Sequence, residues 1–199
     1  MEGIPMHVQI ESSAQASFEQ PLQLLMDCHR RIEHFLQVLA RLVDVEVGEE
    51  LSDEQRRALE TALTYFRDAA PRHTQDEEQS LFPRLREAAG TEAIEAFKLM
   101  DALEADHVRA DNLHRQIDAR GLEWLRSGGL SPVGRAEMSL WLKELQPLYQ
   151  RHLQIEDGEI FPFAGRTLTP EQIHAVGGEM KDRRSDIFRR RPHGSAHPE

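Results

Sequence analysis

The chain of 199 residues has a single cysteine, Cys28, so it cannot form an internal disulfide, and we expect a reducing, cytoplasmic setting. No run approaches the roughly eighteen apolar residues that a membrane-spanning helix needs. The segment Met1–Gln20 lacks the basic start and the apolar stretch of a secretory signal. The sequence therefore predicts a cytoplasmic protein with no membrane partner.

Basic residues are outnumbered by acidic ones, with 24 Lys and Arg against 35 Asp and Glu and a net charge of −11. An acidic surface repels the phosphate backbone, which argues against a nucleic-acid partner. The chain also shows no phosphate loop, no nucleotide motif and no pairing of a nucleophile with a base. Ten histidines stand beside only two tyrosines. Many histidines and many carboxylates in one chain favour metal binding.

The sequence predicts an all-α protein, because no segment shows the alternation of a strand and the turn signals are those of helix ends. Ser52–Gln55 reads as a capping box, and Gly128 follows a helix. We expect an irregular arm at 1–19, a four-helix bundle at 20–165, and a short helix with a flexible tail at 166–199. The predicted helices are 20–47, 52–88, 91–127, 132–160 and 170–187. Their short connections favour antiparallel, up-down-up-down packing.

Histidines fill the missing places in the apolar stripes of the predicted helices. In the first helix, Leu25, Ile32 and Leu36 follow the three-four spacing of an inward face, and His29 occupies the gap. His73, His107 and His152 fill equivalent gaps in the other three helices. A buried side chain that can ionise needs a partner.

The chain repeats one helix-pair unit. His73 and Glu77 precede Leu81-Phe82-Pro83, and His152 and Glu156 precede Ile160-Phe161-Pro162 at the same offsets. His29 and His107 stand 44 and 45 residues before these pairs. At about 1.5 Å per residue, the arms on either side of each histidine have similar lengths. All four histidines are therefore predicted to meet at one level, with the two units facing each other.

This spacing suits a metal site, because His-x-x-x-Glu places both side chains on one helix face. Four imidazoles and two carboxylates suit iron, manganese or zinc, and a carboxylate can bridge two ions. Structural zinc needs only four ligands, so six exceed its requirement. The alternative is that the histidines are hydrogen-bonded core residues without metal.

These residues resemble the hemerythrin-like, or HHE cation-binding, family over about 20–165. The resemblance implies a di-iron centre, with two iron ions joined by an oxo or hydroxo bridge and oxygen as a ligand. His29, His73, His107 and His152 would be terminal ligands in it, and Glu77 and Glu156 would bridge. Members of the family bind, sense or store oxygen, respond to nitric oxide or iron, or show peroxide chemistry.

The chain departs from the oxygen-carrying members of the family, which have a second histidine where Asp111 stands here. Asp111 is a candidate extra ligand. Glu33, at the matching place of the first helix, is a candidate acceptor for an imidazole N–H. Asp157 competes with Glu156 for the bridging role, and Tyr149 lies within reach of the centre but is more simply a packing residue.

The leading hypothesis is a di-iron protein that binds oxygen or a related small molecule for sensing, storage or delivery. A di-iron oxidase or peroxidase acting on peroxide or nitric oxide is the alternative, and the carboxylate at Asp111 favours it by making the site harder. A third reading is an iron-responsive module, in which metal stabilises the fold. The expected partners are thus O2, peroxide or nitric oxide, in a monomer or homodimer.

Overall fold

The computed structural model describes residues 17–44, 50–90 and 93–190, and every regular element in these ranges is helical. Most of the predicted arm at 1–19 and the end of the predicted tail, 191–199, lie outside the described residues. The elements are α1 Pro21–Val43, α2 Asp53–Asp68, α3 Ala70–Asp76, η1 Glu77–Leu81, α4 Phe82–Ala88, α5 Ile94–Ser127, α6 Pro132–Ile155, η3 Glu156–Ile160, α7 Phe161–Thr167 and α8 Pro170–Arg190. The prediction of an all-α chain is confirmed. No helix in the described part is long and apolar enough to cross a membrane.

The helix ends follow the predicted signals. The Ser52 hydroxyl accepts the backbone N–H of Gln55 at 3.2 Å, and the Gln55 side chain accepts the backbone N–H of Ser52 at 2.8 Å. This closed pair satisfies two donors that the first turn of α2 would leave open. Gly128 ends α5 with a φ of 78°, a left-handed conformation that glycine adopts without strain.

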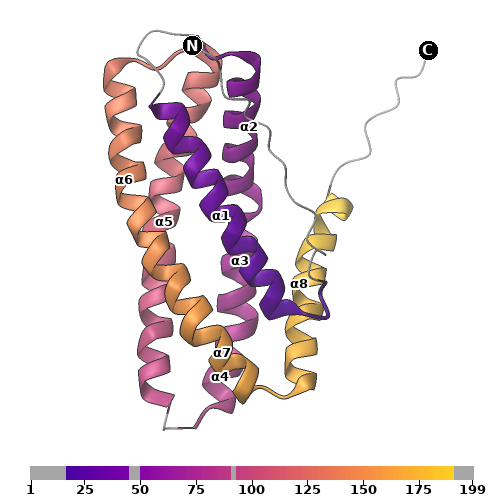
Figure 1. Cartoon of the computed structure of the whole chain (residues 1–199). Coiled ribbons are helices and arrows are strands. Elements are labelled where there is room, and N and C mark those ends of the chain that lie inside the picture. Colours follow the sequence, from indigo (N-terminus) through magenta and orange to yellow (C-terminus); the bar gives the residue numbers. More distant parts are fainter. Residues whose placement is uncertain (1–16, 45–49, 91–92, 191–199) are drawn as a thin grey trace, which may run out of the picture.

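Long helical columns lie side by side (Figure 1). The elements α2, α3, η1 and α4 follow one another along one column, and α6, η3 and α7 along another. Both α1 and α5 pack against α2 and α6. Each long column therefore contacts two others and turns one face inward.

The core consists of two apolar clusters. One cluster contains the part of α1 after His29, together with α2 and much of α5 and α6. Its Leu39, Leu59 and Leu145 are fully buried. The other gathers the start of α1 with α4, α7 and α8, with Leu25 and Phe82 fully buried. In every column the histidine falls at the change from one cluster to the other. The polar layer is thus enclosed by apolar side chains on both sides.

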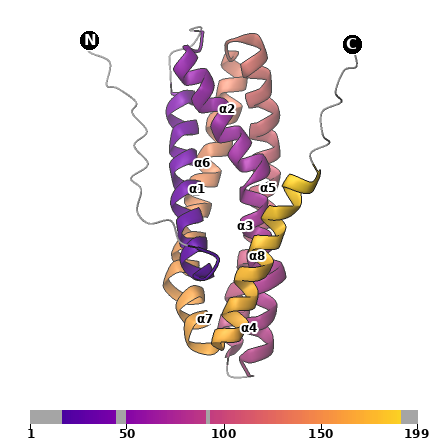
Figure 2. The same ribbon diagram turned by 90° about the vertical axis from the view of Figure 1, so that its right-hand side faces the viewer.

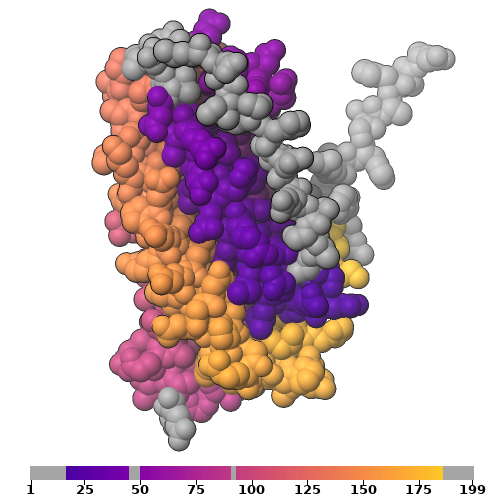
Figure 3. Space-filling model, viewed as in Figure 1, coloured from indigo at the N-terminus to yellow at the C-terminus, as the bar shows by residue number. Residues whose placement is uncertain are grey.

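The last helix, α8, packs against α1, α3 and η1 (Figure 2). Its Val176 and Met180 are fully buried in the second apolar cluster. In the space-filling view, the yellow surface of α8 meets the indigo start of α1 and the orange α7 (Figure 3). The predicted fifth helix is therefore an integral part of the fold.

We predict that Leu145→Ala lowers the free energy of unfolding by about 2–5 kcal/mol, because it leaves a cavity at a position with no exposure. Denaturant unfolding measures the change. The matched control is Leu140→Ala on the same helix, where the side chain is 64% exposed and the expected change is within about 0.5 kcal/mol. Equal losses at the two positions would contradict the assigned inward face of α6.

Candidate metal centre

Two helical columns widen into a π turn where the candidate ligands lie. The N–H of Phe82 bonds to the carbonyl of Glu77, and the N–H of Phe161 bonds to that of Glu156. A proline follows each phenylalanine; it has no N–H, and its ring clashes with the carbonyl four residues earlier in a regular helix. The wider turn relieves that conflict. Such π turns occur frequently at functional sites, and here each begins at a buried glutamate.

The first metal-sized group combines His29, His73, Glu77 and Glu156, whose ligand atoms lie within 4.8 Å of one another. His73 Nε2 lies 3.3 Å from Glu77 Oε1, and His29 Nε2 lies 3.3 Å from Glu156 Oε2. The two Nε2 atoms approach each other to 3.2 Å. Nitrogen lone pairs at this separation repel unless a proton or a cation stands between them.

The second group combines His107, His152 and Glu156. His152 Nε2 lies 3.0 Å from Glu156 Oε1, and His107 Nε2 lies 3.4 Å from Glu77 Oε2. Each glutamate therefore presents one oxygen to each histidine pair. This is the arrangement that a carboxylate needs to bridge two cations. The prediction that the four histidines meet at one level is confirmed.

The four oxygens of Glu77 and Glu156 have no hydrogen-bond partner, although both side chains have no exposure. An ionised carboxylate in a dry interior is costly unless it is paired or coordinates a metal. If the histidines were only hydrogen-bonded core residues, their N–H groups would be well aligned with these oxygens. The four histidines here make no such hydrogen bond to Glu77 or Glu156. The residues present thus fit a pair of metal ions.

Carboxylates behind the imidazoles fix which nitrogen faces the centre. His29 Nδ1 lies 2.8 Å from Asp157, and His107 Nδ1 lies 2.8 Å from Glu78. Each acid follows Glu77 or Glu156 in the sequence and reaches the first histidine of the other unit. Because the Nδ1–H donates to an acid, Nε2 is left for a metal. Asp106 lies 3.7 Å from His152 Nδ1, too far for a hydrogen bond, and its carboxylate accepts from Arg151 instead.

The fourth imidazole, that of His73, has a thiol as its neighbour in place of an acid. Burial works to raise the pKa of Cys28, but the interactions of the thiol with His73 and Arg31 lower that pKa to about 7. Cys28 precedes His29 as Asp106 precedes His107. The repeat therefore pairs a thiol in one unit with a carboxylate in the other.

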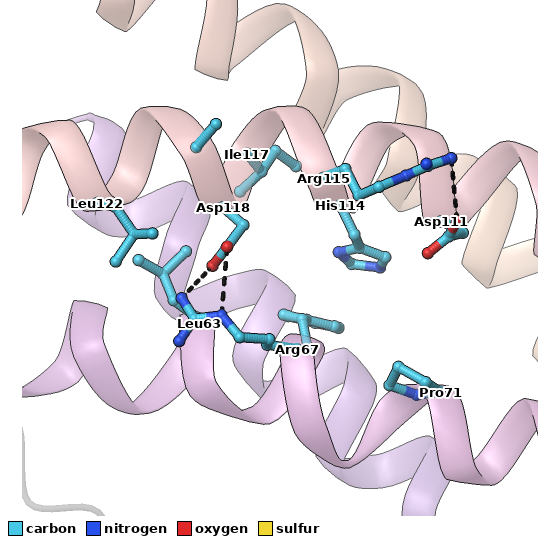
Figure 4. Close-up of a pocket in the computed structure, with 11 residues that line it drawn as sticks. Leu63, Arg67, Pro71, Asp111, His114, Arg115, Ile117, Asp118 and Leu122 are labelled. Atoms are coloured by element: carbon cyan, nitrogen blue, oxygen red, sulfur yellow. Dashed lines mark hydrogen bonds and ion pairs between the residues drawn. The ribbon is translucent and has the colours of Figure 1, made fainter.

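The remaining sequence candidates do not join the two groups. Asp111 is 61% exposed and pairs with Arg115 at 3.1 Å, on the wall of a cavity between α2 and α5 (Figure 4). Four residues turn a regular helix by about 400°, so Asp111 rotates about 40° past His107 toward the rim. Glu33 is also exposed. Tyr149 is buried, and its hydroxyl lies 3.0 Å from His114 Nε2.

Opposed charges set the protonation of the metal-free centre. Burial acts to lower the pKa of His29, but the hydrogen bond to Asp157 and the nearby carboxylates of Glu156 and Glu77 outweigh it and raise that pKa to about 12. Burial is likewise outweighed at His107, where Glu77 and Glu78 raise the pKa to about 10. Burial raises the pKa of Glu77, but the surrounding histidines hold it well below its usual value. The carboxylates thus attract positive charge, as protons or as metal.

These features define a class: an all-helical protein with a buried histidine–carboxylate centre for cations. The comparison with known families agrees, since the model of the Hemerythrin HHE cation binding domain matches residues 20–164. The chain belongs to this hemerythrin family. It is also 26% identical over 177 residues to an uncharacterized protein of Haemophilus influenzae, covering 88% of this chain and 96% of that protein.

Metal uptake is predicted to release protons. At pH 7 the metal-free His29 and His107 hold protons, because their pKa values are raised to about 12 and about 10. A metal must displace both, so at least two protons leave per loaded chain and affinity increases as pH rises. A pH indicator in weakly buffered solution measures the release. Calcium, which does not favour imidazole, is the control; loading without proton release would contradict the assignment.

We predict that Asp157→Asn and Glu78→Gln each weaken metal binding by about 10–100-fold, because each removes the charge that orients an imidazole. Competition with a chromogenic chelator measures the affinity. Glu159→Gln is the matched control, since Glu159 lies on the same π turn as Asp157 but is exposed. If the control loses as much affinity, general surface charge rather than imidazole orientation explains the effect.

Proposed function

We propose that the chain is a non-haem di-iron protein that binds oxygen or a related small molecule, for sensing, storage or delivery. The observation that carries this proposal is the bridging geometry of Glu77 and Glu156, each with one oxygen toward each histidine pair. Mixed imidazole and carboxylate donors suit iron, and paired sites of this kind occur in helix bundles. The family description itself names only a cation.

The helix contacts support an up-down-up-down four-helix bundle around this centre. The pairs α1–α2, α2–α5, α5–α6 and α6–α1 close a ring. Short connections between successive columns favour antiparallel neighbours. In such a bundle, ligands from all four columns reach the axis at one depth.

A di-iron centre would supply the electrons and open coordination positions that small molecules such as O2, peroxide or nitric oxide require. Each histidine pair shares two bridging carboxylates, so each position has four protein donors. The two apolar clusters exclude water from either side of the layer. Asp157 and Glu78 hold the Nδ1 protons, so the imidazoles keep their orientation.

A redox enzyme acting on peroxide or nitric oxide is the second candidate. The observation that favours it is the Tyr149–His114 hydrogen bond, with the Tyr149 ring 6.2 Å from the ring of His152. A tyrosine at this distance is near enough to exchange an electron with the centre.

A cytoplasmic location and a monomeric or homodimeric state remain expectations from the sequence.

An anaerobic titration with ferrous iron tests the proposal, with visible absorption recorded before and after oxygen is admitted. We expect two irons per chain and near-ultraviolet bands after oxygen. A reversible oxygen-dependent change favours binding or sensing, and turnover with peroxide or nitric oxide favours the enzyme. The bridging role predicts that Glu77→Gln and Glu156→Gln each reduce the stoichiometry to one iron or less.

Gln154→Glu is the matched control, because it adds a carboxylate at an exposed place two residues before Glu156 and should leave two irons bound. Unchanged folding without iron uptake by the wild-type chain would overturn the proposal. Uptake of a single zinc ion in preference to iron would do so as well.

A further inference from the structure

The residue before the bridging Glu77 is held entirely by α8. Asp76 has no exposure, and each of its carboxylate oxygens accepts a hydrogen bond from a different arginine. Arg183 Nε donates at 2.8 Å and Arg184 Nη2 donates at 2.7 Å. A buried carboxylate with two charged donors is strongly fixed in position.

The same helix also fixes the other end of the π turn. Ser80 has no exposure, and its hydroxyl contacts both Glu179 and Arg183 of α8. Arg84 pairs with Glu179 at 2.6 Å and donates to the Ser80 carbonyl at 2.9 Å. The turn that carries Glu77 is thus bounded on both sides by contacts to α8.

The depth at which α8 sits is set by close packing. A Cβ at Gly177 would overlap the carbonyl oxygen of Phe18, so the backbones meet directly there. Arg184 lies over the Phe18 ring, 5.6 Å from its centroid. At Gly178, by contrast, a Cβ would meet nothing within 4 Å. One glycine faces the interface and its neighbour faces open space.

Comparison of the two units shows that the π turn itself does not need this support. Ile155 and Glu159 occupy the places of Asp76 and Ser80 in the second unit. Ile155 packs into the apolar cluster, and Glu159 is exposed. The polar attachment to α8 is therefore specific to the first unit, and α8 lies beyond residues 20–164 that match the family.

We propose that Arg183 and Arg184 position the bridging Glu77 through Asp76, so that docking of α8 and metal binding are coupled. The proposal rests on the cation centre of the proposed function and adds its regulation. Without the arginines, Asp76 must turn toward water, because an unpaired carboxylate charge is costly at a position with no exposure. Glu77, the next residue on the same turn, then loses the orientation that spans both histidine pairs.

Electrostatics alone predicts the opposite sign. Removing two positive charges from the neighbourhood of a cation site strengthens cation binding by Coulomb's law. Positioning predicts weaker binding when the same charges are removed. The direction of the change therefore separates the two explanations, and a purely supporting role for α8 predicts no change in affinity.

The test uses the full chain with Arg183→Gln and Arg184→Gln combined. Ferrous iron is titrated anaerobically, and hydrogen exchange is followed at the amides of α8 with and without iron. We expect affinity to fall at least tenfold. Coupling is reciprocal, so iron should protect α8 amides in the wild-type chain by the same factor and fail to do so in the variant.

Gly177→Ala and Gly178→Ala form a matched pair that changes no charge. The first should displace α8 and weaken iron binding as the arginine variant does, and the second should behave as wild type. Loss of α8 protection with unchanged or tighter iron binding overturns the proposal. Retention of α8 protection in both the arginine and the Gly177 variants overturns it too, because the contacts would not hold the helix. If the wild-type chain binds no iron, the proposed function fails instead.

Discussion

The structure depends on two fully buried glutamates whose charge must be balanced inside the bundle. Glu77 and Glu156 bring four carboxylate oxygens into a layer closed by apolar clusters, and histidine nitrogens face them at 3.0–3.4 Å without a well-aligned hydrogen bond. Carboxylate charges persist in a dry interior only when they are paired or bind a metal. With Glu78 and Asp157 behind the imidazoles, the layer carries four carboxylates, and two divalent cations would neutralise them. The metal-free layer balances part of this charge with protons on His29 and His107.

Two copies of one helix-pair unit place the histidines that face the buried glutamates. A histidine on one helix and a histidine–glutamate pair on the next supply half a centre, and the second copy supplies the other half. The outer acids cross between the units, since Glu78 serves His107 and Asp157 serves His29. Neither unit can therefore complete its own imidazole orientation. The Phe-Pro sequences after the pairs impose the same π turn on both columns.

The convergence of the candidate ligands could be predicted from the sequence because its information is local. Helical period, offset and residue type determine which side chains share a face and a level. The acids that hydrogen-bond the imidazoles, Glu78 and Asp157, could not be predicted in the same way. Spacing alone offered Glu33 and Asp111 as well, because each lies four residues after a histidine, as Glu77 and Glu156 do. What distinguishes them is the rotation of each helix and the π turn, which tertiary packing fixes. The π turns had a signal in the repeated Phe-Pro. The contacts of Asp76 with α8 join residues more than a hundred positions apart, so no local sequence pattern predicts them.

The two histidine pairs have the same ligand types but different surroundings. The pair of His29 and His73 has the Cys28 thiol behind it and lies on the unit that α8 holds. The pair of His107 and His152 has Asp106 behind it and the Tyr149–His114 hydrogen bond nearby. Charge and polarizability behind an imidazole tune the metal that it binds. A site built from two similar halves thus becomes unequal through residues outside the two candidate metal groups, and two cations held there would differ in their surroundings.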